Sequence, residues 1–322
     1  MHGQPTLSLI SPTDETESPP NSADYSAGSC RPPKPNSGTP HSALSSVRES
    51  VVRYRGNDYE RTDDYLAVEE PLQIRLAGED VAVTMRTPGH DAELAAGFLF
   101  TEGIIAGKQH IEAIAYCPLD DGSRSQNVIN VLPTNRALLE PGSWGRNFIS
   151  SSSCGLCGKT SIQQVSLRSK VQSPKSDSHT PLSTLRIPPG LFYALEAKLR
   201  AAQETFTQTG GLHAAALFDL DGDLIVLRED VGRHNAVDKI IGYALLQDQL
   251  PLDRHIVVVS SRASFEIIQK ALTSGVQVLA AFSAPSSLAV ELARQADMTL
   301  VAFLRQGRLN IYAGEERVMR ET

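Results

Sequence analysis

The strongest constraint on the fold is an alternation of two hydrophobic patterns over residues 212–312. Continuously apolar runs occur at Ile256–Val259, Val278–Phe282 and Leu300–Phe303, and stretches with helical spacing lie at 235–246, 264–273 and 286–295. This alternation is typical of a largely parallel sheet with helices on both faces. Hairpins expected at 212–227 and 300–312 would make the sheet mixed. The sequence therefore predicts an α/β fold here.

The rest of the chain divides by composition. Residues 1–48 hold eight of the 19 prolines and no hydrophobic periodicity, which predicts a disordered tail. Residues 49–167 combine strand signals with a helical stripe, which predicts a smaller N-terminal α+β domain ending in a cysteine-containing loop. The polar residues 168–186 are expected to form a linker or insertion, and 187–315 a C-terminal α/β domain. Within the N-terminal domain, strands are expected at 65–68, 72–76, 81–85, 111–117 and 128–132, and a helix at 91–102.

Charge and composition exclude several classes of protein. The formal net charge is −7, which argues against a broad basic surface for nucleic acid. No apolar run approaches the roughly 18 residues of a membrane-spanning helix, and no apolar signal-peptide core opens the chain. Four cysteines are too few for a disulfide scaffold. We therefore expect a cytoplasmic protein without a membrane or nucleic-acid partner.

The segment Ser150–Thr160 contains two closely spaced cysteines, Cys154 and Cys157. A structural zinc site needs four ligands, usually as two pairs, and the sequence has no second pair, so no metal site is predicted. A Walker A phosphate loop would need glycine at the position of Ser153, which excludes that interpretation. A thioredoxin-like redox pair is a weaker alternative, because the preceding residues are a serine run rather than a strand and turn.

The surroundings of the pair favour a reactive thiol. Lys159 and a helix expected to start near Thr160 would both stabilise a thiolate. Gly155 and Gly158 let the backbone bend and keep the sulfurs accessible. The sequence therefore predicts a nucleophilic or sulfur-carrying cysteine on a loop, with a buried, inert pair as the alternative.

Polar turns follow several predicted strands of the C-terminal domain. The run Arg228–Lys239 connects a strand to a helix and contains Gly232, Arg233 and His234. Ligands of open α/β sheets gather at such turns, and the unpaired N–H groups of a helix start attract anions. His234 could transfer protons or cap the helix. Asp238 and Lys239 are expected on the surface of the first helical turn.

Three further features belong to the same set of turns. Arg262 follows one apolar strand, and Ser283 follows the next. The last turn, Phe303–Arg308, carries two arginines and could clamp a diphosphate. The alternatives are serines that only cap helices and a solvated surface hairpin.

Together these motifs resemble the FdhD family of formate dehydrogenase accessory sulfurtransferases. The resemblance rests on Cys154–Gly158, on Glu229–Lys239 and on the turn Phe303–Arg308, with support from Glu70–Leu72 and Ala95–Leu99. It covers about Tyr65 to Tyr312.

The resemblance implies a function. Members of the family take persulfide sulfur from a cysteine desulfurase and pass it to the molybdenum bis(molybdopterin guanine dinucleotide) cofactor of formate dehydrogenase. Cys154 would carry the persulfide and Cys157 would assist. The cofactor, bound as cargo, would lie at the last turn and the preceding ones. The residues concerned are Phe303, Leu304, Arg305, Gln306, Gly307, Arg308, Gly232, Arg233, His234, Arg262 and Ser283.

The resemblance also implies a cytidine-deaminase-like C-terminal fold and a homodimer. The zinc signature of deaminases is missing from the sequence, so deamination is not implied. Two rival functions stay open: a molybdenum-cofactor chaperone whose cysteines only grip a partner, and a thiol-disulfide oxidoreductase.

Overall fold

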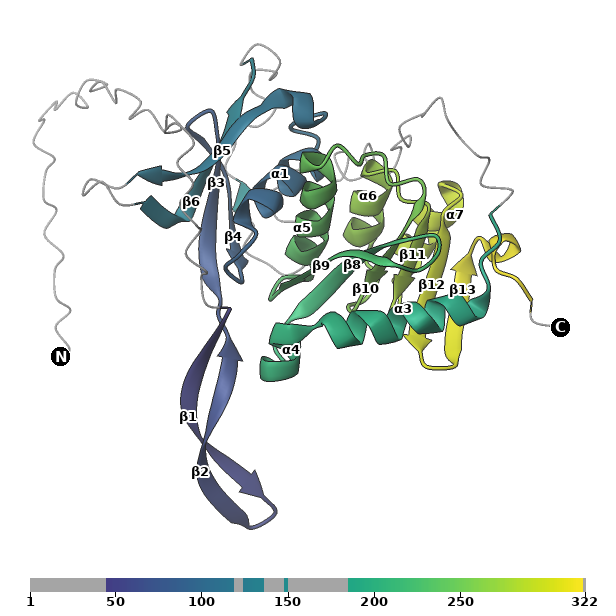
Figure 1. The fold of residues 1–322 in the computed structure, drawn as a ribbon, viewed down its shortest axis with the longest axis horizontal. Coiled ribbons are helices and arrows are strands. Elements are labelled where there is room, and N and C mark those ends of the chain that lie inside the picture. Colours follow the sequence, from purple (N-terminus) through teal and green to yellow (C-terminus); the bar gives the residue numbers. More distant parts are fainter. Residues whose placement is uncertain (1–44, 119–123, 136–147, 150–184, 321–322) are drawn as a thin grey trace, which may run out of the picture.

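The computed structural model describes residues 45–118, 124–135, 148–149 and 185–320. Figure 1 shows two sheets with helices α1 (Asp91–Thr101) and α5 (Arg233–Leu246) between them. A long two-stranded ribbon projects away from this body (Figure 1).

The larger sheet has six strands in the order β13-β12-β11-β10-β8-β9. These strands are β8 (His213–Asp219), β9 (Leu224–Asp230), β10 (His255–Val259), β11 (Val278–Ala281), β12 (Thr299–Arg305) and β13 (Arg308–Ala313). Strands β10, β11 and β12 are parallel, whereas the flanking strands pair antiparallel. The mixed α/β class predicted from the sequence is confirmed, with parallel pairing in this sheet confined to its three central strands.

Helices cover both faces of this sheet, as the apolar strands require. Side chains alternate along β10: Val257 and Val259 face one core, and Ile256 and Val258 face the other. The first core is closed by α5, by α6 (Phe265–Thr273) and by α7 (Ser287–Gln295). The second is closed by α3 (Pro189–Ala202), which crosses the opposite face (Figure 1).

The smaller sheet has five strands in the order β5-β6-β3-β4-β7. They are β3 (Glu70–Leu76), β4 (Glu79–Arg86), β5 (Ile111–Pro118), β6 (Arg124–Pro133) and β7 (Phe148–Ile149). Leu72, Ile74 and Leu76 alternate along β3, are fully buried and pack in one core with Leu94 and Leu99 of α1. This alternation places α1 on the inner face of the sheet, where it meets α5.

The contact between α1 and α5 is made by backbone. A Cβ atom built on Gly97 would lie 1.9 Å from the carbonyl oxygen of Asp238, and one on Gly242 would lie 1.8 Å from that of Glu93. Only glycine lets the two helices approach this closely. The two sheets are therefore held in one body at a contact with no room for side chains.

The projecting ribbon consists of β1 (Ser46–Arg55) and β2 (Asp58–Ala67), paired antiparallel over their full length. Its first three residues fall within the segment 1–48 that the sequence analysis assigns to the tail. Most of its side chains are half-buried or exposed, so it lacks the alternating apolar pattern by which strands are recognised in a sequence. The remaining domain boundaries stay predictions.

The described residues also include three short helices. They are η1 (Lys108–His110), α4 (Glu204–Thr209) and η4 (Glu315–Arg317). Ile187 forms a bridge with Val318, which ties the start of the C-terminal region to its end. None of the helices in the described ranges has the length and apolarity needed to span a bilayer.

Candidate functional site

The carboxyl ends of neighbouring strands are tied together beyond the sheet itself. The Ser283 N–H donates to the Ser261 carbonyl over 3.4 Å, and the Phe303 N–H donates to the Ser283 carbonyl over 3.2 Å. On the other side, the Ser260 hydroxyl accepts from the Ala214 N–H over 2.8 Å. These contacts align the ends of β10, β11 and β12 with the start of β8. We call this margin, comprising residues 213–214, 260–262, 283 and 303–308, the strand-end edge.

The last turn sits at one end of the strand-end edge. Phe303 has a φ of 52°, a left-handed conformation unusual for a bulky residue, where the pairing of β12 with β13 is irregular. Arg305 donates to the Phe282 carbonyl over 2.6 Å, and its guanidinium lies 5.9 Å from the Phe282 ring centroid. Arg308 pairs with Arg305 in register and is exposed. Both side chains are exposed, but Arg305 is held by these protein contacts.

The start of α5 lies at the other end, beside β8 and β9. Gly232 is the N-cap residue, so the helix begins earlier than Asn235 and His234 is not its cap. Asp230 is fully buried and accepts hydrogen bonds from the Gly232 N–H at 2.8 Å and from Asn235 Nδ2 at 3.0 Å. Because Gly232 has no side chain, no cap competes for the N–H groups of the first turn.

The expectation that Asp238 and Lys239 lie on the surface is wrong, since each is 1% exposed. Lys239 Nζ lies 2.7 Å from Asp230 and donates to the Thr87 carbonyl over 3.0 Å. Asp238 pairs with Lys270 at 2.9 Å. Asp238 also accepts a hydrogen bond from Thr101 of α1, so Asp238 and Lys239 both link α5 to the N-terminal part of the chain.

His213 is a member of the strand-end edge that the sequence analysis missed. It is the first residue of β8, pairs in register with Asp230 and is half-buried. Burial is the main cause that lowers its pKa below the usual value near 6.5. The charges of Arg233, His234 and Arg262 lower that pKa further. Its only sequence signal is a histidine at the second position of the strand predicted from residue 212.

His234 projects toward α6 rather than toward solvent. Its buried Nε2 atom lies 3.7 Å from Glu266 Oε2, beyond hydrogen-bond range, and has no other hydrogen-bond partner among the described residues. Burial acts to raise the pKa of Glu266, but His234, the backbone N–H of Glu266 and Ser264 together lower that pKa below its usual value. His234 therefore faces the Glu266 carboxylate of α6.

Comparison with known proteins identifies the family. The model of the FdhD/NarQ family matches residues 67–319, which is most of the chain. The chain belongs to the FdhD/NarQ family. The resemblance seen in the sequence motifs is thereby confirmed, and the ribbon up to residue 66 precedes the matched region.

Several FdhD/NarQ relatives are close. A protein of Streptomyces coelicolor is 50% identical over 273 residues, which cover 84% of this chain and 95% of the relative. One from Saccharolobus solfataricus is 39% identical over 84% of this chain and 97% of its own length. Both are named sulfur carrier protein FdhD.

A solved structure shares the fold of this FdhD/NarQ chain. It is a crystal structure from Desulfotalea psychrophila, described as that of a formate dehydrogenase accessory protein. Its TM-score is 0.66 at 25% identity, over 86% of this chain and the whole of the other.

The predicted catalytic residues of this FdhD/NarQ chain, Cys154 and Cys157, lie outside the described residues, as does Lys159. The described residue that precedes them most closely is Ile149 in β7, which pairs with Val83 of β4 in parallel. The carboxyl end of β7 therefore points in the direction of Thr87. In the described ranges, no three His, Cys, Asp or Glu side chains gather as metal ligands would.

The predicted cofactor-binding residues all lie in the described part of this FdhD/NarQ chain. Arg233, His234 and Arg262 lie close enough for their charges to act on His213. Ser283 and the turn 303–308 continue the edge away from this cluster. The structure thus brings the predicted residues to one margin of the larger sheet, with the basic cluster at one end and Arg308 at the other.

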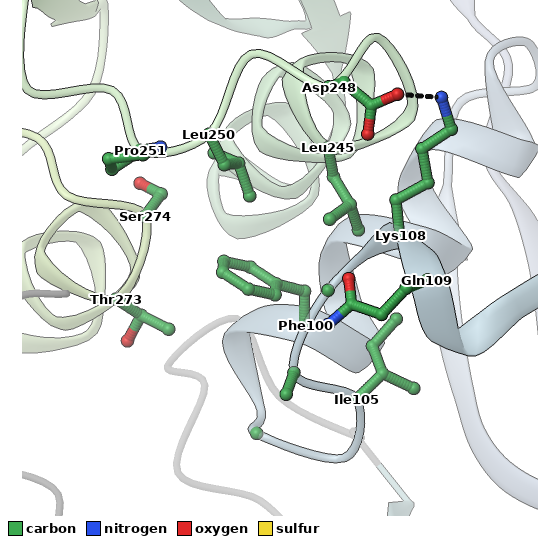
Figure 2. Close-up of a pocket in the computed structure, with 13 residues that line it drawn as sticks. Phe100, Ile105, Lys108, Gln109, Leu245, Asp248, Leu250, Pro251, Thr273 and Ser274 are labelled. Carbon is green, nitrogen blue, oxygen red and sulfur yellow. Dashed lines mark hydrogen bonds and ion pairs between the residues drawn. The ribbon is translucent and has the colours of Figure 1, made fainter. Parts of the chain in front are cut away.

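A hollow of about 590 Å³ lies at the opposite end of α5 (Figure 2). Phe100, Ile105 and Leu245 give it a mainly apolar lining, and an ion pair between Lys108 and Asp248 stands at its margin. None of the residues predicted from the FdhD/NarQ motifs lines it. The strand-end edge is therefore the candidate site.

Proposed function

We propose that this chain carries persulfide sulfur on Cys154, from a cysteine desulfurase to the molybdenum bis(molybdopterin guanine dinucleotide) cofactor required by formate dehydrogenase. Membership of the FdhD/NarQ family supports this proposal, and relatives about 50% identical are named sulfur carrier proteins. The related solved structure is described as a formate dehydrogenase accessory protein. The protein would act in the cytoplasm as a homodimer.

Loading is a transfer of sulfane sulfur between two cysteines. The Cys154 thiolate attacks the outer sulfur of the donor persulfide, a new S–S bond forms, and the donor cysteine leaves as a thiolate. One S–S bond replaces another, so no external oxidant is needed. Lys159 would keep Cys154 ionised, and Cys157 would assist its discharge to the acceptor.

The observation that carries the proposal is the direction of β7 relative to the strand-end edge. Val83 lies four residues before Thr87, about 13 Å along β4, and the Val231 N–H donates to the Thr87 hydroxyl over 3.2 Å. Since Ile149 pairs with Val83 in parallel, the carboxyl end of β7 points along β4 toward Thr87 and the start of α5. Five residues reach at most about 18 Å, which covers that span.

The strand-end edge offers the groups that a dinucleotide cofactor needs. The exposed guanidinium of Arg308 can bind a diphosphate through two parallel hydrogen bonds, beside Arg305. The uncapped first turn of α5, with Arg233 and His234, favours a second anionic group. Ser283 and Arg262 line the margin between them. We propose that Phe303–Arg308 and these residues hold the guanine-dinucleotide cargo.

Mass spectrometry tests the sulfur-carrying step. After incubation with a cysteine desulfurase and cysteine, Cys154 should gain one sulfur, about 32 Da, which dithiothreitol removes. Cys154→Ala should lose the adduct, and Cys157→Ala should keep it. Cys117→Ala is the matched control, because that thiol is buried in β5 and should not take up sulfur.

The same variants separate the rival functions, by mass spectrometry and by restoration of formate dehydrogenase activity. A cofactor chaperone predicts that Cys154→Ala still restores formate dehydrogenase activity to extracts that lack this protein. A thiol-disulfide oxidoreductase predicts a Cys154–Cys157 disulfide and no added sulfur. An adduct found on Cys117 alone would overturn the assignment to Cys154.

A further inference from the structure

His213 stands where three elements meet at the basic end of the strand-end edge. It opens β8 next to Ala214, whose N–H and carbonyl bond to Ser260 at the end of β10. Across the hairpin its register partner is Asp230, three residues before α5 begins at Arg233. The backbone of His213 is therefore held between β9 and the end of β10, near the first turn of α5.

The charges that face His213 are mostly positive. Arg233 and His234 come from the first turn of α5, and Arg262 comes from the loop after β10. Asp230 is the one carboxylate among the groups that act on His213 in the described residues. It is already bonded to Lys239, Asn235 and Gly232. Glu266 of α6 faces His234 instead.

A bound anion would stabilise such a cluster of positive charges. Arg233 and Arg262 keep their charges at any physiological pH, so an unpaired imidazolium beside them is unfavourable. Consistent with this, the pKa of His213 lies below its usual value in the free protein. A bound phosphate group would reverse the sign of the local field and allow His213 to protonate.

We propose that His213 binds a diphosphate of the cargo at the basic end of the strand-end edge as an imidazolium, so that ligand binding takes up a proton. This inference rests on the proposed function, because it assumes that a dinucleotide is bound at the strand-end edge. It adds a ligand-binding residue that the sequence motifs do not include, and it names the ligand class as a diphosphate diester.

The sign of the pH dependence follows from the two pKa values of His213. The pKa is lowered in the free protein and would be raised when an anion is bound. Between these two values binding takes up a proton, so affinity falls as the pH rises, by at most about tenfold per pH unit. Above both values His213 is neutral in either state, and affinity stops changing.

The probe should not titrate in the same range. The terminal phosphate of GDP has a second pKa near 6 and would mimic the effect. A guanosine diphosphate sugar carries the diphosphate as a diester, as the cofactor does, and keeps its charge. Calorimetry in buffers of different ionisation enthalpy then counts the protons taken up on binding.

The full-length protein and three variants give the expected results. The unchanged protein should take up about half to one proton at pH 6.5. His213→Gln should take up almost none and bind roughly tenfold more weakly at pH 6, yet within about twofold of the unchanged protein at pH 8. His255→Gln is the matched control, a half-buried histidine whose pKa is also lowered by burial, at the other end of β10.

Other outcomes would overturn the inference. Proton uptake that persists in His213→Gln but vanishes in His234→Gln assigns the proton to His234. Tight binding of the probe without proton uptake removes His213 from the site but leaves the sulfur-carrying function intact. Failure of the unchanged protein to bind the probe removes the binding site itself, whereas the sulfur adduct on Cys154 is measured independently.

Discussion

Arg305 and Arg308 occupy the same turn but have different surroundings. Arg305 donates to the Phe282 and Leu304 carbonyls and lies over the Phe282 ring, so it supports the irregular end of β12. Arg308 is exposed on the facing strand. The contacts of Arg305 stabilise the fold, whereas the exposed side chain of Arg308 is available to a ligand. The structure thereby divides a pair that the sequence shows only as two arginines.

We predict that Arg308→Ala weakens GDP binding by about tenfold to hundredfold, because a charge-assisted hydrogen bond contributes roughly 1.5–3 kcal/mol. Isothermal calorimetry at constant salt measures the change. Arg308→Lys should recover only part of the affinity, since an ammonium lacks the planar pair of donors. The melting temperature should stay unchanged, as the side chain is exposed. Equal affinity in Arg308→Ala and the unchanged protein would return this turn to an ordinary surface hairpin.

Turns after apolar strands are visible in the sequence, so the positions of Arg262, Ser283 and the turn 303–308 at strand ends can be predicted from it. Their role in binding a ligand stays a prediction. Asp238 and Lys239 were misplaced, because a charged pair on a helix is normally solvated and the covering helix α1 comes from a distant part of the chain. His213 was missed because its role depends on charges from α5 and from the loop after β10.

Helices α1 and α5 meet at two glycines, and this contact sets the distance between the sheets. The backbone nitrogen of Gly97 lies 2.8 Å from where a Cβ of Gly242 would stand. Any larger side chain must push the helices apart, and with them β4 and the start of α5. This approach therefore positions the strand-end edge relative to the N-terminal sheet.

Gly242→Ala should destabilise the protein by at least about 3 kcal/mol, because the added methyl group overlaps the Glu93 carbonyl. Helix propensity alone would favour alanine by roughly 1 kcal/mol, so the sign of the change reports the clash. Gly190→Ala is the control, since a Cβ at this α3 position meets no atom within 4 Å, and it should be neutral or stabilising. Urea unfolding measures both. A Gly242→Ala protein as stable as the unchanged one would show that the helices lie farther apart.

Among the elements, long periodic segments were predicted best. The strands and helices of the larger sheet lie where their apolar patterns indicate, since those patterns reflect burial. The ribbon β1–β2 was missed over most of its length. Its side chains alternate between two solvent-facing sides, and cross-strand pairs such as Arg48 with Asp63 hold it rather than a core. Hydrophobic patterns reflect burial, and no side chain of the ribbon is buried, so its sequence carries no such pattern.

The described residues form one body, and residues 1–44 are not among them. Ser45 and Ser46 contact Thr205 and Gln208 of α4 through side-chain hydrogen bonds of 3.2 and 2.8 Å. The ribbon is thereby attached to the C-terminal region at its base. A truncation that respects this contact must end before Ser45.

Deleting residues 1–44 should leave the melting temperature within about 2 °C and sulfur loading of Cys154 unchanged, because the segment's composition cannot support a core. Differential scanning calorimetry and the mass assay check both. Deleting 1–67 is the comparison: it also removes the ribbon and its contacts with α4, and it should lower the melting temperature measurably. A marked loss of stability on deleting 1–44 alone would contradict the predicted tail.

The anchoring of Ile149 beside Val83 has a kinetic consequence. A thiol tethered within about 18 Å of a fixed point samples a volume equivalent to an effective concentration of several tens of millimolar. A free thiol would have to reach a similar concentration to compete with the tethered one for the same acceptor. If a cofactor binds at the start of α5 as we propose, its sulfuration by Cys154 would be a first-order process whose rate does not change on dilution. Cellular abundance of the protein would then set how many cofactors are handled, and not how fast each one receives its sulfur.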